Sequence, residues 1–264
     1  MCQDETVNVL YVYAVTRGAA TPNCEGIDGT RRFGTTEAGG VFAVFTAVPA
    51  DEMSQDVIDR RANDLEWLGA IGYRHQAVAG DLMKSTAIVP LRAFTLFSSE
   101  EALRSYLVEH RDMLAKTLDR LDGKQEWTLR IELDAEKWSE SLVSRVDSLR
   151  TLQEEIDASA PGKAFLLRKK LDEEKKRASH AAEEELVAEV ESTVLAKLDC
   201  ETVAETRERR EGAFPQINVL VNRDEEAVLQ ELHRELTARY EDEGVTLVLS
   251  GPWPPYTFAG ETHV

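Results

Sequence analysis

The residues that most often carry out chemistry are few in this chain, and they are widely spaced. No two of the five histidines lie three or four positions apart, so the HxxxH spacing of helical metal ligands is absent from the sequence. These histidines are His75, His110, His180, His233 and His263. The three cysteines, Cys2, Cys24 and Cys200, form no Cys-x-x-Cys pair and predict neither a zinc site nor a disulfide framework.

The common motifs for binding phosphates or holding a nucleophile are also missing. The sequence contains no GxxxxGK[ST], no GxGxxG after a predicted strand and no GxSxG. The acidic runs at residues 172–174 and 183–185 lie among basic residues and lack the glycine and ligand spacing of a calcium-binding EF-hand. We therefore expect no catalytic residue, no metal and no cofactor, and we interpret the acidic runs as solubilising surface.

One charged side chain lies in an otherwise apolar stretch. Residues 86–97, TAIVPLRAFTLF, have the composition of a buried strand, and Pro90 indicates an edge position or a bulge because it cannot donate a ladder hydrogen bond. Arg92 follows two positions later, where an unpaired buried charge would be very costly. Its guanidinium must reach solvent, pair with a carboxylate or meet a partner, and structural pairing is the simplest of these interpretations.

The stretch near the C-terminus is rich in rings and prolines. Residues 250–258, SGPWPPYTF, combine three prolines with Trp253, Tyr256 and Phe258, so they favour an extended path and not a helix. The simpler interpretation is a tail that covers the preceding sheet. The alternative is an aromatic contact surface for a partner, because Trp and Tyr dominate the energetics of protein interfaces.

The composition restricts the class of protein and its partners. With 264 residues, 42% of them hydrophobic, the chain is long enough for two domains with real cores. Its 31 basic and 49 acidic residues give a formal charge of -18, which disfavours binding to nucleic acid and to anionic membranes. The sequence shows no export signal and no apolar run near the roughly 20 residues needed to span a bilayer. We expect a soluble, cytoplasmic protein.

The first half of the chain predicts an α+β domain over residues 1–123. Strands are expected at residues 7–15, 41–48 and 86–97, with an irregular connection at residues 17–40 that holds a short extended piece near residues 31–35. A long or broken helix is expected at residues 54–83, and another helix runs from the Ser99 region to Leu121 before a stop at Gly123. These elements predict an N-terminal α+β sandwich.

The second half, residues 124–264, predicts a ferredoxin-like βαββαβ domain with an enlarged first helical segment. Strands are expected at residues 126–133, 201–210, 216–221 and 245–249, with a helix at residues 223–242 before the last strand. A helical insertion covers about residues 135–199, and its second helix should be about 50 Å long. Its narrow apolar seam packs either on the preceding helix, as a coiled-coil-like helical hairpin, or on a partner protein. Residues 250–264 are expected to form the C-terminal tail of this domain.

Four passages together resemble the gas vesicle protein F/L family. They are the opening LYVYAV, the combination of His75 with IVPLRAFTLF, the passage LDGKQEWTLRIEL and the terminal SGPWPPYTF. These passages occur in the expected order over nearly the whole chain. The sequence departs from the family pattern at Ala14, where a glycine is common, and at residues 92–94, where Arg-Phe-Gly is common.

The resemblance implies a non-enzymatic accessory protein of gas vesicle formation, located at gas vesicles and in the cytoplasm. Such a protein would contact the small hydrophobic shell protein, gas vesicle protein A, and limit its aggregation during nucleation and assembly. The residues expected to contact the partner are Trp253, Tyr256, Phe258, Arg92 and His75. Two other classes stay open, a coiled-coil scaffold that bridges other gas vesicle accessory proteins and a small-molecule enzyme or ligand-binding domain.

Overall fold

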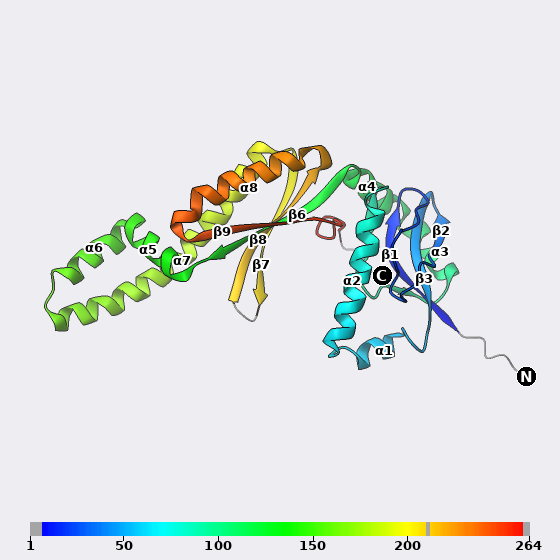
Figure 1. Cartoon of the computed structure of the whole chain (residues 1–264), viewed down its shortest axis with the longest axis horizontal. Helices are drawn as coiled ribbons and strands as arrows, with labels where there is room; N and C mark the ends of the chain where they lie inside the picture. Colours follow the sequence, from blue (N-terminus) through cyan, green and yellow to red (C-terminus); the bar gives the residue numbers. More distant parts are fainter. Residues whose placement is uncertain (1–6, 210–211, 261–264) are drawn as a thin grey trace, which may run out of the picture. The chain divides into compact units, whose positions relative to one another are not determined.

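The computed structural model describes residues 7–209 and 212–260, and of residues 207–209 and 212–214 it describes the backbone alone. The chain mixes helices and strands and divides into two compact units (Figure 1). Unit 1 comprises Met1–Glu126 with Pro252–Val264, and unit 2 comprises Trp127–Gly251. The sequence placed residues 250–264 with the second half, whereas the chain from Pro252 onward belongs to unit 1 because its aromatic residues pack there.

Unit 1 is built on a five-stranded sheet with the order β2-β3-β1-β4, in which β5 also pairs with β1. Its strands are β1 (Asn8–Thr16), β2 (Gly34–Ala38), β3 (Val41–Pro49), β4 (Ile88–Pro90) and β5 (Leu96–Phe97). Strand β1 is covered on both faces, since every residue from Tyr11 to Val15 is fully buried. This burial explains why its sequence is a continuous apolar and aromatic run.

Helices lie on both sides of this sheet (Figure 1). They are α1 (Gln55–Arg60), α2 (Leu65–Leu82), α3 (Glu100–Glu109) and α4 (Arg111–Leu121). Helix α2 starts where the Asp64 side chain accepts a hydrogen bond from the Trp67 N–H, and it packs on the sheet face that carries Tyr11 and Tyr13. The helix predicted at residues 54–83 is thus broken, and the single helix predicted up to Leu121 divides at His110.

The strand predicted over residues 86–97 was wrong in its extent. Only β4 and β5 are strands, and both pair with β1 on either side of a register shift between Val12 and Ala14. Between them the chain turns, because Phe94 adopts a φ of +69°, a left-handed conformation that is uncommon outside glycine. Arg92 is exposed at this turn, so its guanidinium reaches solvent, which is one of the three outcomes left open by the sequence, and the simplest of them, structural pairing, is not observed among the described residues.

Unit 2 has a four-stranded sheet with the order β7-β8-β6-β9. Its strands are β6 (Lys124–Leu133), β7 (Cys200–Arg209), β8 (Gly212–Asn222) and β9 (Val245–Trp253). Its helices are α5 (Ala135–Arg145), α6 (Asp147–Asp157), α7 (Pro161–Lys197) and α8 (Glu226–Tyr240), with short 3₁₀ turns η1 (Arg223–Glu225) and η2 (Glu241–Glu243) around α8. The first helix of the predicted insertion at residues 135–199 is interrupted at Val146, whereas its long second helix is continuous, as predicted.

One hydrophobic core joins the helices of unit 2 to its sheet. Near the sheet, Val190 and Val194 of α7 and Leu232 of α8 are buried in the same cluster as residues of β6 and β8. Toward the start of α7, the cluster continues through Leu171 of α7 and Leu152 of α6. There α6 and the first half of α7 form an antiparallel hairpin (Figure 1). Helix α7 therefore packs on two partners. Its first half packs on α6 in the hairpin, and its second half covers the sheet.

Candidate functional site

The C-terminal aromatic segment is anchored within unit 1. The carbonyl of Phe258 accepts a hydrogen bond from the Arg120 guanidinium, and the Phe258 ring is buried. The carboxylate of Glu126 accepts hydrogen bonds from the N–H and the hydroxyl of Thr257, at 3.0 and 2.7 Å. Trp253, at the end of β9, keeps 40% of its surface exposed. Of the three predicted contact rings, Phe258 is therefore part of the core and Trp253 is accessible.

Tyr256 meets the buried His75 of α2, their ring centroids being 6.3 Å apart. His75 is 3% exposed, and both of its ring nitrogens are in hydrogen bonds. Nε2 lies 2.9 Å from the carbonyl oxygen of Leu91, which can only accept, so Nε2 carries the proton. Nδ1 then accepts from the hydroxyl of Tyr11, 2.9 Å away. This pattern fixes a neutral His75 in one tautomer.

The same network holds the turn between β4 and β5. The Tyr11 hydroxyl accepts a hydrogen bond from the Phe94 N–H at 3.2 Å while it donates to His75. The Phe94 ring in turn lies 5.4 Å from the Trp67 ring of α2. We call Tyr11, Tyr13, His75, Phe94 and Tyr256 the His75 cluster, because their rings contact one another in a chain.

Burial keeps the His75 cluster uncharged. It lowers the pKa of His75 to about 4, against the smaller raising effect of the hydrogen bond to Leu91. Burial also raises the pKa of the Tyr13 hydroxyl to about 12 and that of the Tyr11 hydroxyl still further from its ordinary value. Near neutral pH these groups neither gain nor lose a proton. The cluster is thus suited to holding the C-terminal segment and the turn in place.

The predicted residues separate into two sets. His75 and Tyr256 come together in the His75 cluster. Phe258, two residues after Tyr256, is buried and anchors the segment. Arg92 stays outside the cluster, and its carbonyl accepts hydrogen bonds from the N–H and hydroxyl of Thr95 at the start of the turn. Arg92 and Trp253 therefore remain accessible to a partner, whereas the other three residues support the fold.

The sequence did not predict the most exposed apolar surface of unit 1. Leu65 and Tyr73 of α2 are each 78% exposed, and Gly69 and Gly72 have no atom within 4 Å of the position where a Cβ would stand. At 3.6 residues per turn these four positions fall within an arc of about 100°. We call them the α2 face. The signal in the sequence was the pair of glycines inside a helix, which cost stability without serving any turn.

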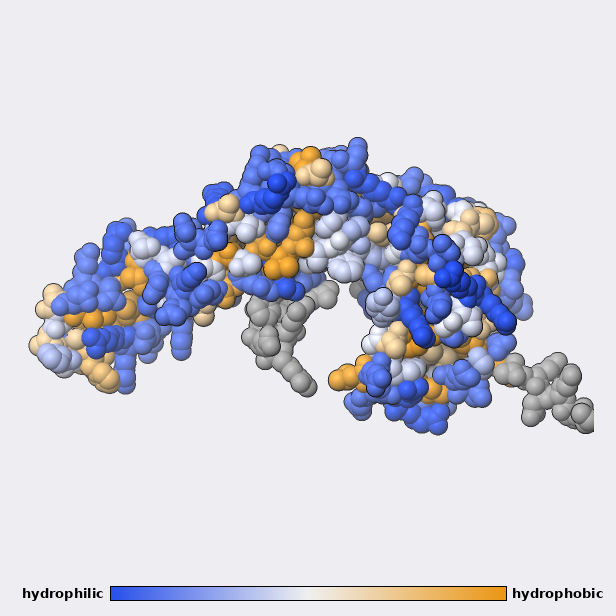
Figure 2. Space-filling view, in the orientation of Figure 1, coloured by the Kyte–Doolittle hydropathy of each residue, from blue (hydrophilic) through white to orange (hydrophobic). Residues whose placement is uncertain are grey.

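The α2 face is also poor in charge. From Leu65 to Gly80 the charged residues are Glu66 and Arg74, and the Arg74 guanidinium donates to the Ile27 carbonyl at 3.0 Å. The face of the molecule that is drawn in Figure 2 is largely hydrophilic, as the predominance of blue shows. An apolar face with little charge is what a protein partner requires, and such faces mark interaction sites on soluble proteins.

Over residues 7–209 and 212–260, no group of three or more His, Cys, Asp or Glu side chains is arranged to hold a metal ion. No helix in the part of the chain that the structure describes is both long and apolar enough to cross a membrane.

Two gas vesicle proteins resemble the chain along almost its full length. It is 28% identical to gas vesicle protein L of Streptomyces sp. (strain CB03234), over 97% of this chain and 94% of that protein. It is 26% identical to gas vesicle protein L1 of Halobacterium salinarum, over 97% of this chain and 92% of that protein.

Solved structures show the same fold. The crystal structure of the gas vesicle protein GvpF from Anabaena sp. PCC7120 matches with a TM-score of 0.69 at 14% identity, over 97% of this chain and 98% of that chain. GvpF from Microcystis aeruginosa matches with a TM-score of 0.67 at 13% identity, over 96% and 99%. The family model described as gas vesicle synthesis protein GvpL/GvpF matches residues 9–260. The resemblance seen in the sequence is thus confirmed, and the chain belongs to the GvpL/GvpF family of gas vesicle synthesis proteins.

Proposed function

We propose that this chain is an accessory protein of gas vesicle formation that binds the hydrophobic shell protein, gas vesicle protein A, and limits its aggregation during nucleation and assembly. We further propose that some copies stay with the finished vesicle as a minor component. Family membership supports the role in gas vesicle formation. The observation that supports binding of the shell protein is the α2 face, because it is an apolar surface confined to one helix of an acidic protein.

The physical requirements of this role match the surface of unit 1. Shell subunits must expose apolar area before they assemble, and a protein that holds them apart needs a limited apolar face of its own. The net charge of -18 keeps loaded copies apart by mutual repulsion. At Gly69 and Gly72 a partner helix could approach the α2 backbone closely, since no side chain stands between them.

Trp253 is the second proposed contact. A half-exposed tryptophan offers a large ring area at low entropic cost, which is why Trp is frequent among interface hot spots. Arg92 is a third, solvent-facing candidate for polar recognition at the rim. His75, Tyr256 and Phe258 contribute indirectly in this proposal, by holding the chain that presents Trp253 and Arg92.

Co-purification with gas vesicle protein A tests the proposal. We expect the full chain to retain the shell protein and to reduce the light scattering of shell protein released from denaturant. The double variant Leu65→Glu/Tyr73→Glu should lose at least about tenfold in retention, because a carboxylate on each exposed position opposes apolar contact. The control is Val108→Glu on α3, a residue that is 60% exposed outside the α2 face.

Two results would reject the proposal. Retention of the shell protein by the Leu65→Glu/Tyr73→Glu variant at the wild-type level would remove the α2 face as the binding site. Failure of the wild-type chain to retain or protect the shell protein, under conditions where the chain is folded, would remove the binding function altogether. Trp253→Ala is the matching variant for the second contact and should lower retention by a smaller factor.

A scaffold that bridges other gas vesicle accessory proteins is the second candidate. The observation in its favour is the long helix α7, whose first half forms a hairpin with α6 away from the sheet (Figure 1). In that case substitutions in the α2 face would leave binding unchanged, whereas substitutions in the α6–α7 hairpin would abolish it. The same co-purification with the remaining accessory proteins as bait separates the two candidates.

We also propose a two-domain description of the fold, an N-terminal α+β sandwich followed by a ferredoxin-like domain with a helical-hairpin insertion. The order of elements from β6 to β9 and the sheet order β7-β8-β6-β9 support it. An experimental structure with a different strand order in this sheet would overturn the ferredoxin-like assignment.

A further inference from the structure

The end of the α6–α7 hairpin carries an exposed apolar pair with basic neighbours. Phe165 and Leu166, in the second turn of α7, are 57% and 66% exposed. Orange residues gather at this end of the hairpin in Figure 2. Four cations flank the pair and form no ion pair with any carboxylate that the structure describes; they are Lys163, Arg168, Lys169 and Lys170. We call these six residues the tip.

The tip is unusual for a protein with a formal charge of -18. Residues 161–170 contain four basic residues and no acidic one. The Lys169 ammonium lies 5.2 Å from the centroid of the Phe165 ring, so part of the exposed ring already contacts a cation. Positive charge next to exposed apolar area fits an acidic partner that has an apolar pocket.

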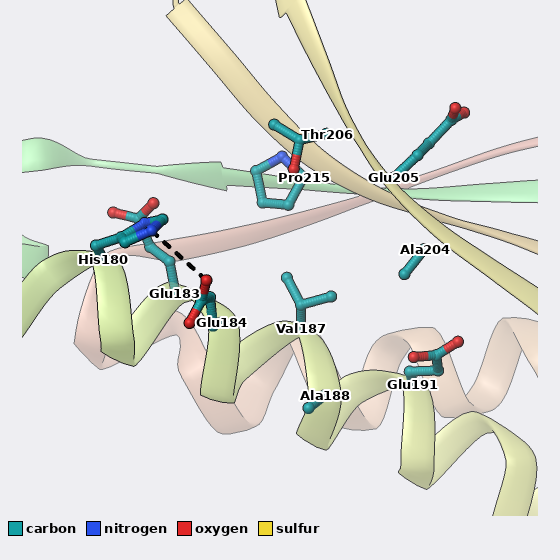
Figure 3. A pocket seen from close by; sticks show the side chains of 10 residues that line it. All are labelled: His180, Glu183, Glu184, Val187, Ala188, Glu191, Ala204, Glu205, Thr206 and Pro215. Carbon is teal, nitrogen blue, oxygen red and sulfur yellow. Dashed lines mark ion pairs between the residues drawn. The ribbon is translucent and has the colours of Figure 1, made fainter.

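Unit 2 itself contains a pocket of that chemistry. A cavity of about 470 Å³ lies between α7 and the β7–β8 strands, within the usual size range of binding pockets. Figure 3 shows Val187 of α7 directed toward Pro215 of β8, with Ala204 of β7 beside them, which gives the cavity an apolar floor. Three carboxylates of α7 flank this floor: Glu183, Glu184 and Glu191. We call these six residues the groove.

The carboxylates of the groove lack strong cationic partners. Glu183 accepts a hydrogen bond from the Ser179 hydroxyl at 2.8 Å, and Glu191 accepts one from the Thr202 hydroxyl at 2.7 Å. Glu184 lies 3.5 Å from a ring nitrogen of His180 (Figure 3). None of the three forms an ion pair with a Lys or Arg that the structure describes. Their negative charge is therefore available to a basic ligand.

The tip and the groove cannot meet within one molecule. Both lie on the continuous helix α7, and Phe165 precedes Val187 by about six turns, or roughly 33 Å along the axis. A helix that is packed along both halves cannot fold back on itself over this distance. Any contact between tip and groove must therefore join two molecules.

We propose that the tip of one copy docks into the groove of a second copy of this chain. Phe165 and Leu166 cover the apolar floor formed by Val187, Ala204 and Pro215, while the flanking Lys and Arg residues face Glu183, Glu184 and Glu191. The contact is heterologous, so a pair keeps one free groove, on the copy whose tip is docked, and one free tip, on the other copy. Association then continues into short head-to-tail chains. This surface is distinct from the α2 face and does not depend on shell protein binding.

Sedimentation velocity of the full chain is the first test. The average mass should rise above the 29.5 kDa of one chain as the protein concentration increases. Raising the salt from about 0.05 M to about 0.5 M should weaken association several-fold, because the rim charges are screened. A wild-type chain that stays monomeric at its highest soluble concentration in low salt would overturn the proposal.

Variants on each side locate the contact. Phe165→Glu removes the tip, and Glu184→Lys/Glu191→Lys reverses the charge of the groove; each should weaken self-association at least about tenfold. The matched controls are Val228→Glu, at an exposed site on α8, and Glu136→Lys/Glu140→Lys, at exposed sites on α5. The controls should associate like the wild type, and an unchanged thermal midpoint shows that each variant is folded.

Mixing the two variants is the decisive experiment. The Phe165→Glu variant keeps an intact groove, and the Glu184→Lys/Glu191→Lys variant keeps an intact tip, so together they should form one-to-one dimers of about 59 kDa, twice the mass of one chain. They should form nothing larger, because no further intact pair remains. Two monomeric variants that stay monomeric when mixed would reject the tip-to-groove contact even if the wild type self-associates.

Discussion

At the scale of single residues, the Tyr11 hydroxyl connects the most distant parts of unit 1. It accepts from the Phe94 N–H in the turn after β4 and donates to His75 on α2, which contacts Tyr256 near the C-terminus. Removing this hydroxyl would leave the buried His75 nitrogen and the partly buried Phe94 N–H without this hydrogen bond. Buried groups left unsatisfied in this way cost more than the bond itself contributes.

Tyr11→Phe should therefore lower the free energy of unfolding by about 1–3 kcal/mol. Urea denaturation of the full chain measures the change. Tyr73→Phe removes the same atom from a ring that is 78% exposed, and it should change stability by less than about 0.5 kcal/mol. Equal effects of the two substitutions would show that the buried network contributes nothing to the free energy of unfolding.

His75 should make unit 1 sensitive to mild acid. Its pKa in the folded chain is about 4, below the ordinary 6.5, so the unfolded chain binds the proton more readily. This contribution to stability is complete above pH 6.5 and is lost as the pH falls from 6.5 toward 4, by roughly 3 kcal/mol in total.

The measurement is urea denaturation as a function of pH for the wild type and for His75→Gln. The carboxylates with lowered pKa, Asp64, Asp81 and Glu100, titrate in both proteins, so the difference between the two curves isolates His75. The difference should shrink between pH 6.5 and 4. Parallel curves over this range would contradict the buried, neutral state of His75.

At the scale of elements, the periodicity of apolar residues predicted the regular helices and strands but not the points at which they are interrupted. β1, β3, β6 and α7 were predictable because burial on one or both faces leaves a clear pattern in the sequence. The divisions at His110 and Val146 were not, because the apolar stripe continues across each break. The turn at Phe94 was hidden as well, since its N–H donates to the hydroxyl of Tyr11, which lies on a strand 83 residues away in sequence.

The site was predictable only in part, for a related reason. Aromatic residues in a proline-rich stretch indicate contact, but the sequence cannot tell whether the ring faces a partner or the chain's own core. Phe258 and Tyr256 turned inward to Arg120 and His75, partners that are distant in sequence. The α2 face was missed because two glycines in a helix do not by themselves show which side of the helix stays exposed.

Those glycines give a prediction for α2 as an element. Gly69→Ala and Gly72→Ala should each raise the free energy of unfolding by about 0.5–1 kcal/mol, since a Cβ at either position meets no atom within 4 Å. If α2 binds the shell protein through its backbone face, the same substitutions should weaken retention of that protein.

Thermal unfolding and co-purification measured on the same samples check both effects. Gly162→Ala in the first turn of α7, which is also open, serves as the control and should leave shell protein retention unchanged. Stabilisation of α2 without any loss of retention would mean that the partner does not approach this backbone.

At the scale of the whole molecule, each unit has its own hydrophobic core, and the chain passes from unit 1 to unit 2 and back. The returning segment supplies buried groups to unit 1: Phe258 is 4% exposed, and Thr257 bonds to the buried Glu126. Stability of unit 1 should depend on a segment that unit 2 does not need.

A chain that ends after Gly251 should therefore lose stability in unit 1 and keep it in unit 2. Hydrogen exchange should become faster along α2 and residues 88–97, while α7, α8 and β8 keep their protection. A chain that ends after Gly260 retains every described contact of the segment and should exchange like the full protein. Uniformly faster exchange over both units would show that they unfold as one.

The returning segment also sets an order of events during synthesis. A ribosome makes the first part of unit 1, then the about 125 residues of unit 2, and only afterwards the residues that complete unit 1. At about 5–20 residues per second, this delay lasts roughly 6–25 s. For that time the ring of His75 lacks Tyr256 and the carboxylate of Glu126 lacks Thr257. Unit 2, which is continuous in sequence, is able to finish folding first, so the N-terminal unit is the last part of this protein to mature.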